Sequence, residues 1–195
     1  MMSSREGPTA SAPPKITITP LPSSLPSPIP TSTITLTISG HPTTVIAQSF
    51  VDRIFITVTQ LSKFGCLYQA STAPNPSSTL LDSDPSATDS ILPPPLPTTS
   101  ITKLVGTEPS PSHTALYQLY VAQIASIVTS TASKQDARPL VVSLALKPTA
   151  SAQLGVKDAV VRNDDDDEVD SLMSSEEERK RYMGVMDAVK QCRVW

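Results

Sequence analysis

The feature that most constrains the fold is a run of β-branched and aromatic residues that leads into a short polar turn and a second apolar run. Residues 54–59 read Ile-Phe-Ile-Thr-Val-Thr, and Gln-Leu-Ser-Lys-Phe-Gly follows at 60–65. Such residues favour strands, and a polar segment that ends in glycine, of which the chain has only 6, is typical of a turn. We therefore predict a strand, a turn and a second strand at 66–71, joined as a hairpin.

Alternating residues predict further strands around this hairpin. Ile34, Leu36 and Ile38 alternate with threonines, which is the pattern of a half-buried strand. Gly40-His41-Pro42 predicts a turn, because glycine allows positive φ and proline blocks pairing. Other predicted strands lie at 43–47, 100–106 and 139–147, the last almost continuously apolar and therefore buried. The strand at 54–59 has apolar residues on both faces, so we expect it to be central.

Two helices are predicted from their caps and apolar spacing. Ser110 precedes Pro111, which gives an N-cap followed by proline at the first helical position. The apolar residues of this helix recur every three or four positions, at Leu116, Leu119, Tyr120, Ile124, Ile127 and Val128. Ser174 and Ser175 each have glutamate three residues on, a capping-box signature, and are also candidate phosphorylation sites. The second helix is expected over 176–190, with an inner face marked by Tyr182, Met186 and Val189.

These elements predict a small α+β single domain with an antiparallel sheet of about six strands and two main helices. The length of 195 residues also argues for one domain. Clusters of the 20 prolines predict a disordered Pro/Ser-rich tail at 1–30, and the folded domain is expected over 31–195. Within it we expect a disordered insert at 72–98 and an acidic loop at 150–173. Pro93–Pro97 could form a polyproline II ligand for an SH3 or WW groove, but no Arg or Lys flanks it to set an orientation.

Charge and residue usage disfavour several classes of protein. The net charge is −3 and no stripe of Lys and Arg is present, so binding to nucleic acid is not expected. We expect no secretory signal and no membrane span, since the first residues are polar and the apolar runs are short. Cys66 and Cys192 are distant in sequence and are expected to be reduced, packed thiols. The expected location is cytoplasmic, with the nucleus as a second possibility.

The residues that usually carry catalysis or metal binding do not form a recognisable pattern. His41 and His113 are the only histidines, and no motif places a nucleophile beside either of them. The acidic run at 163–168 lacks the glycine and the alternating ligands of a calcium loop, which favours a solvated spacer. We therefore predict no catalytic residue, no metal site and no cofactor.

Several segments resemble, in the same order, the proteasome assembly chaperone 3 family. Residues 56–60 with Lys63 and Gly65 resemble the family's VVVTQ-x-x-K-x-G-T pattern, with Cys66 where the family often has threonine. The strand that ends in Thr102-Lys-Leu-Val-Gly106, the helix after it and the apolar strand at 140–147 recur in the same order. The end, Cys192-Arg-Val-Trp195, resembles the family's C-x-V-W terminus. The tail, the insert and the acidic loop depart from the family and fit an enlarged, fungal-type member.

This resemblance implies a function and partners. Family members form a heterodimer with proteasome assembly chaperone 4, and the pair binds α-type subunits of the 20S proteasome and promotes assembly of the α ring. We interpret Gln60, Lys63 and Gly65 as a recognition turn and Trp195 as an anchor that either packs in the core or contacts a partner. For Gly65 the simpler interpretation is a turn that requires positive φ.

Two other classes of function stay open at this point. A trafficking adaptor or scaffold with a longin-like or roadblock-like fold would also present a bare sheet to partners. An unrecognised hydrolase is the third class, and it would depend on one of the two histidines.

Overall fold

The computed structural model describes residues 27–73, 92–132, 136, 138–148 and 175–195. Its strands are β1 (Thr31–Ile38), β2 (His41–Ser49), β3 (Ile54–Thr59), β4 (Cys66–Thr72), β5 (Thr99–Val105) and β6 (Leu140–Ala145). Its helices are α1 (Pro111–Thr131) and α4 (Glu176–Gln191). The 6 strands form a single sheet in the order β1-β2-β3-β6-β4-β5. A small α+β domain with about six strands and two main helices is thereby confirmed for the described residues.

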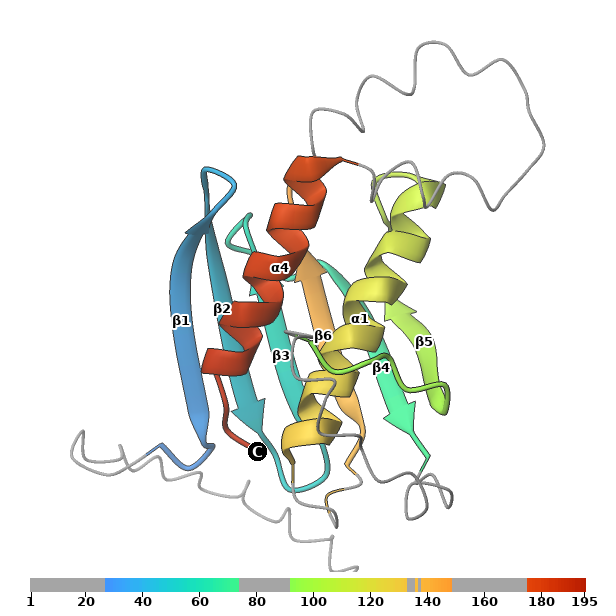
Figure 1. The fold of residues 1–195 in the computed structure, drawn as a ribbon. Coiled ribbons are helices and arrows are strands. Elements are labelled where there is room, and N and C mark those ends of the chain that lie inside the picture. Colours follow the sequence, from blue (N-terminus) through green and yellow to red (C-terminus); the bar gives the residue numbers. More distant parts are fainter. Residues whose placement is uncertain (1–26, 74–91, 133–135, 137, 149–174) are drawn as a thin grey trace, which may run out of the picture.

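Both described helices lie on the same face of this sheet, side by side (Figure 1). α4 packs on β1 and β2, and α1 packs on β4, β5 and β6. Among the described elements no helix covers the opposite face, which we call the open face. Strand register places these side chains on it: Thr33, Thr35, Thr44, Ile46, Phe55, Thr57, Ser143 and Gln69. Neither described helix has the length and apolar character needed to cross a bilayer.

The predicted first hairpin is confirmed, but its turn begins earlier than expected. Ser39 and Gly40 have φ values of 49° and 75°, as both central residues of a type I′ turn require. His41 and Pro42 already belong to β2, where Pro42 lies opposite Thr37. Proline is tolerated there because β2 pairs with β3 only from Thr44 onward, so the missing N–H removes no bond to β3.

The second predicted hairpin is wrong, because β3 and β4 are not neighbours. β6 lies between them, parallel to β3 and antiparallel to β4. The sheet is therefore mixed, where the sequence predicted antiparallel pairing throughout. All residues of β6 are buried, as expected for an apolar strand at the centre of the sheet, where burial is greatest. Crossing one strand is a step of about 10 Å, which the residues between β3 and β4 span easily.

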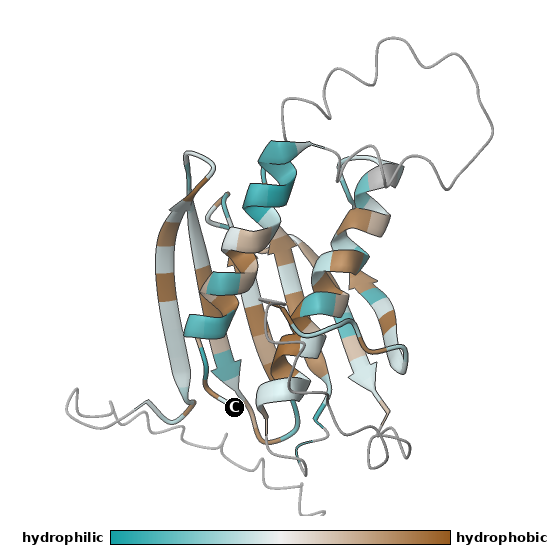
Figure 2. Ribbon diagram, viewed as in Figure 1, coloured by the Kyte–Doolittle hydropathy of each residue, from teal (hydrophilic) through white to brown (hydrophobic). Residues whose placement is uncertain are grey.

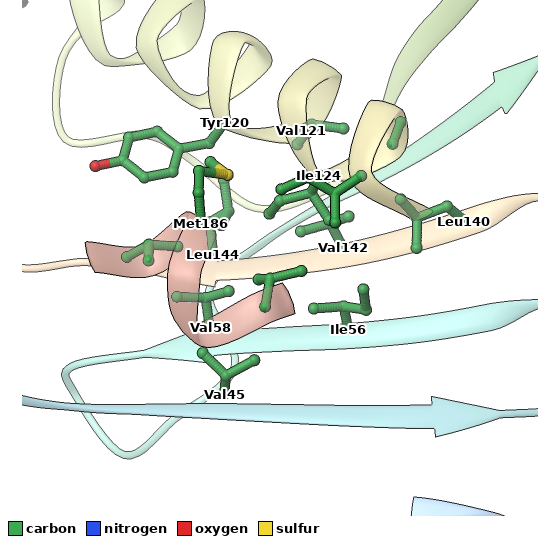
Figure 3. Close-up of a cluster of buried hydrophobic side chains, with 14 of the residues drawn as sticks. Val45, Ile56, Val58, Tyr120, Val121, Ile124, Leu140, Val142, Leu144 and Met186 are labelled. Atoms are coloured by element: carbon green, nitrogen blue, oxygen red, sulfur yellow. The ribbon is translucent and has the colours of Figure 1, made fainter. Parts of the chain in front are cut away.

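The core fills the layer between the helices and the sheet (Figure 3). Tyr120 and Ile124 of α1 and Met186 of α4 meet Val58 and Val142 of the central strands, and all five side chains are fully buried. Figure 2 shows apolar strands behind the helices and a hydrophilic first half of α4. The predicted inner face of the last helix is confirmed, since Tyr182, Met186 and Val189 are all buried.

The start of α4 differs from the predicted capping box. Ser175 occupies the N-cap position but makes no side-chain cap hydrogen bond. Glu178, which would complete the box, points inward and is 1% exposed. Its carboxylate pairs with Arg181 and accepts a hydrogen bond of 2.7 Å from the Tyr120 hydroxyl. Tertiary partners for the carboxylate therefore replace the local cap.

The predicted tail, insert and acidic loop are only partly covered by the structure. Residues 1–26, 74–91 and 149–174, which include the acidic loop and Ser174, lie outside the described residues. Thr72 of the predicted insert is the last residue of β4. Residues 92–97, which we call the strap, lie across α1 and appear as a green tube in front of that helix in Figure 1.

Candidate protein-binding site

The crossing loop, residues 60–65, carries three of the four predicted site residues. It leaves the end of β3, passes the carboxyl end of β6 and enters β4. The Thr59 hydroxyl accepts hydrogen bonds from the backbone N–H groups of Leu61 and Lys63, at 3.2 and 3.3 Å. Such local bonds from a threonine hydroxyl are typical of tight turns. They fix the first half of the loop against β3.

Gln60 is buried, with 6% of its surface exposed, and both ends of its amide have partners within the chain. Its Nε2 donates to Thr43 Oγ1 at 3.0 Å, and its Oε1 accepts from the Lys147 N–H at 3.0 Å. Gln60 thereby joins the start of β2 to the segment after β6. This geometry favours a structural role for Gln60, and its predicted role in recognition stays a prediction.

Gly65 is required for a different reason from the one expected. Its φ is not positive, unlike that of Gly40 and Gly106. A Cβ on Gly65 would instead lie 1.8 Å from the Leu144 carbonyl oxygen and 2.8 Å from the Ala145 Cα. Its N–H donates to Ser143 Oγ at 3.2 Å. Glycine is needed here because the loop passes directly against the backbone of β6.

The outer part of the crossing loop is exposed and carries two apolar side chains beside Lys63. Lys63 is exposed, Leu61 is 38% exposed and Phe64 is 67% exposed. The Phe64 ring lies 6.0 Å from the ring of Phe55 on the open face. Phe64 therefore extends the open face toward solvent, and its exposed ring is the kind of side chain that anchors protein interfaces.

Grooves lie on both sides of Phe64. One, of about 340 Å³, is on the open face and is lined by Thr44, Ile46, Thr57, Thr59, Ser62, Lys63 and Phe64. The other, of about 300 Å³, runs from Leu61 and Phe64 to Gly106, Pro109 and Tyr117. Exposed Leu104 and Val105 end β5. A protruding aromatic residue between two grooves suits a partner polypeptide better than a small molecule.

The fourth predicted site residue, Trp195, lies at the opposite end of the sheet from the crossing loop (Figure 1). The structure does not bring it together with Gln60, Lys63 and Gly65. The indole is partly buried and packs on the core, and its Nε1 donates to Thr131 Oγ1 at 2.9 Å. Three residues before it, Cys192 is 1% exposed, and its Sγ donates to the Ser32 carbonyl at 3.1 Å. Core packing, one of the two predicted roles of Trp195, is what the structure shows, and partner contact stays a prediction.

Trp195 is the only tryptophan, so its fluorescence reports directly on this contact. We expect Trp195→Ala to lower the free energy of unfolding by about 1–3 kcal/mol, because it removes apolar contact and a hydrogen bond at a half-exposed site. Thr131→Val keeps the indole but removes its acceptor. The indole should then be more exposed to water, and we expect the emission maximum to shift to longer wavelength. Unchanged emission in Thr131→Val and unchanged stability in Trp195→Ala would show that the terminus is not docked.

The buried titratable groups between β4 and α1 are held in their uncharged forms. Burial raises the pKa of the Cys66 thiol, and the charge of Glu108 raises it further. Burial also lowers the pKa of His113, as does the charge of Arg181, while Glu178 opposes them. Burial raises the pKa of Tyr117 to about 12. An activated cysteine needs a lowered pKa and a base able to take its proton, so these shifts run opposite to nucleophilic catalysis.

His113 should make stability depend on pH in the range where histidine titrates. Its folded pKa lies below the usual 6.5, so the unfolded chain binds the proton more tightly. The associated stability is present above the unfolded pKa and is lost as pH falls toward the folded pKa. We expect urea unfolding between about pH 7.5 and pH 5.5 to show this loss in the wild type. His113→Gln should show a shallower dependence; a slope equal to that of the wild type would contradict this origin.

Sequence reasoning missed the exposure of Phe64 and the burial of Glu178 with Arg181. The sequence pattern places Phe64 in a polar turn. The chain has only 3 phenylalanines, and one that lies in a polar turn is a candidate for an exposed binding residue. The sequence predicted Glu178 as part of a capping box, and no local signal shows that tertiary structure buries it with Arg181. Nowhere in the described ranges do three or more His, Cys, Asp or Glu side chains gather to hold a metal ion.

Comparisons with known proteins give a similarity to a solved structure. No protein-family profile matches the chain, and no curated protein matches it. A solved structure described as a novel chaperone complex for yeast 20S proteasome assembly is similar, with a TM-score of 0.44 and 11% sequence identity. The similarity covers 83% of this chain and 96% of that chain. Family membership is therefore not established by these comparisons.

Proposed function

We propose that the protein is a non-catalytic assembly chaperone. In this proposal it pairs with a homologue of proteasome assembly chaperone 4, binds α-type subunits of the 20S proteasome and promotes assembly of the α ring. It acts in the cytoplasm or the nucleus and needs no cofactor. We assign the partner chaperone to the open face and the crossing loop beside it.

The observation that carries this proposal is the position of the residues that resemble the proteasome assembly chaperone 3 family. Gln60 joins β2 to the segment after β6, and Gly65 lets the crossing loop pass β6. Gly106 has a φ of 108°, and a Cβ there would lie 2.8 Å from the Cα of Cys66. Cys192 bonds to the carbonyl of Ser32 in β1. Motif residues that are far apart in sequence thus share one task, which is to hold this sheet and its crossing loop in place.

The surface left by this framework supports binding rather than chemistry. A stable interface removes about 800 Å² from each partner, and we assign this area to the open face, which no described helix covers, together with the exposed ring of Phe64. Burial raises the pKa of the Cys66 thiol, which disfavours the nucleophilic thiolate, and lowers the pKa of His113, which makes it a weaker base.

Co-expression tests the proposal against the adaptor alternative. The chain is co-expressed with a candidate homologue of chaperone 4 and analysed by size-exclusion chromatography, with and without 20S α-type subunits. We expect a heterodimer that shifts to a larger species when α subunits are added. Co-purification with small GTPases or coat subunits, or normal maturation of proteasome precursors in cells that lack the protein, would contradict the proposal.

Phe64 provides the sharpest test of the binding surface. We expect Phe64→Ser to weaken binding to the partner chaperone by about tenfold or more, because exposed aromatic anchors dominate interface energy. Its unfolding midpoint should stay close to the wild type, since the ring is 67% exposed. Val51→Ser, at the 99% exposed residue of the loop between β2 and β3, is the matched control and should bind normally. Equal weakening by both substitutions would contradict the assignment of the crossing loop to the interface.

A further inference from the structure

Two buried polar side chains of α1 hold the strap, residues 92–97. Gln123 Nε2 donates to the Pro93 carbonyl at 2.7 Å, and Ser126 Oγ donates to the Pro94 carbonyl at 2.6 Å. The strap covers the side of α1 that faces away from the sheet (Figure 1), so Gln123 is only 3% exposed and Ser126 only 1% exposed. Polar residues on the outer side of a helix are normally solvated, so their burial here depends on the strap.

The geometry of this contact is that of a receptor for proline-rich chain. Consecutive prolines have carbonyls but no N–H groups, so only donors can bind their backbone. Gln123 and Ser126 are one helical turn apart and present donors to two successive carbonyls. The Tyr182 hydroxyl of α4 donates to Gln123 Oε1 at 3.3 Å, which orients the amide with its NH₂ group toward the strap.

The exposure of the strap has the period of a polyproline II helix. Pro93 and Leu96 are half-buried, whereas Pro94, Pro95 and Pro97 are exposed. Residues three apart lie on one side of a polyproline II helix, which has three residues per turn. The strap therefore presents one face to α1 and leaves its other faces in solvent, as a bound peptide does. Leu92, the first residue of the strap, is also partly buried and packs on the core.

We propose that α1 carries a binding site for polyproline segments, built on Gln123 and Ser126, and that the strap is its ligand within the same chain. The ligand class is an extended segment with successive proline carbonyls and an apolar residue three positions after the first. The covalent link gives the strap a high effective concentration, so it excludes peptides supplied in solution. The site is independent of the open face and of the proposed chaperone function.

A peptide-binding experiment on the full chain tests this site. The probe is a fluorescein-labelled peptide with the sequence of residues 92–98, measured by fluorescence anisotropy. The first variant replaces Pro93, Pro94 and Pro95 by glycine, which removes the preorganised strap conformation. We expect the peptide to bind this variant at least about tenfold more tightly than the wild type, because the competing strap is weakened. A scrambled peptide should bind neither protein.

Further substitutions identify the donors. In the glycine variant, adding Gln123→Ala and Ser126→Ala should weaken peptide binding by about tenfold or more, since two buried donors are lost. Adding Gln118→Ala, at an exposed position of α1, is the matched control and should leave binding unchanged. Circular dichroism and urea unfolding accompany each variant. A folded glycine variant that does not bind the peptide, or binding that survives loss of both donors, would overturn the proposal. A glycine variant that fails to fold would also overturn it, because the strap would then be an integral part of the core.

Discussion

Gly65→Ala is expected to unfold the protein or to lower its free energy of unfolding by more than about 4 kcal/mol, a loss reserved for severe steric or charge defects. The added Cβ would lie 1.8 Å from the Leu144 carbonyl oxygen and 2.5 Å from the Leu144 carbonyl carbon. Backbone atoms in the middle of a sheet cannot move aside as a flexible side chain can. Relief of the clash requires β6 to separate from the crossing loop, which disrupts both neighbouring pairings of the central strand. The measurement is urea unfolding followed by circular dichroism, with solubility on expression as the first indication.

Gly40→Ala is the matched control for this substitution. No atom lies within 4 Å of a Cβ built on Gly40, and its cost arises from its φ of 75° alone. A left-handed conformation costs a residue other than glycine about 1–2 kcal/mol. We therefore expect Gly40→Ala to fold with a modestly lower midpoint. If Gly65→Ala were no less stable than Gly40→Ala, the close approach of the crossing loop to β6 would be wrong.

Glu178→Gln is expected to lower the free energy of unfolding by about 3–5 kcal/mol, because it leaves a buried arginine without its countercharge. Arg181 is 2% exposed, and its Nε donates to Glu178 Oε1 at 3.0 Å. Arg181 also donates to the Lys147 carbonyl, and the Tyr120 hydroxyl donates to the same carboxylate. The pair thus joins α4 to α1 and to the segment after β6. Thermal and urea unfolding measure the loss.

Glu176→Gln on the same helix is the control, because Glu176 pairs with Lys180 at the surface, where their side chains are 82% and 70% exposed. Solvent screens that pair, and we expect little change in stability. Replacing both buried partners, with Glu178→Leu and Arg181→Met, should recover part of the loss, since no unpaired charge remains. A single Glu178→Gln variant as stable as Glu176→Gln would show that the pair is solvated in the folded protein.

Much of the secondary structure could be predicted from local pattern. The threonine alternation of β1, the inner face of α4 and the Pro111 start of α1 each depend on residues within a few positions of one another. The pairing of β3 with β4 was predicted wrongly for the same reason, because the short segment between them looks like a hairpin turn. Only the pairings of β6 with both β3 and β4 reveal that a third strand lies between them.

The candidate site divides along similar lines. Lys63 is exposed in the crossing loop, where a binding turn was expected, but Gln60 is buried and bonded within the chain. The motif that suggested both residues does not distinguish a side chain that holds the loop from one that faces a partner. Phe64, beside them, has the exposure that binding requires.

The amino-acid sequence by itself determined which segments become strands and helices and which of their faces are apolar, because backbone preference and side-chain period are local properties. Tertiary structure alone decided the order of the strands, the need for glycine at position 65, the burial of Glu178 with Arg181 and the docking of the strap on α1. Each of these depends on groups that are far apart in the chain. Their free energy comes from burial and hydrogen bonding that exist only after the segments have met.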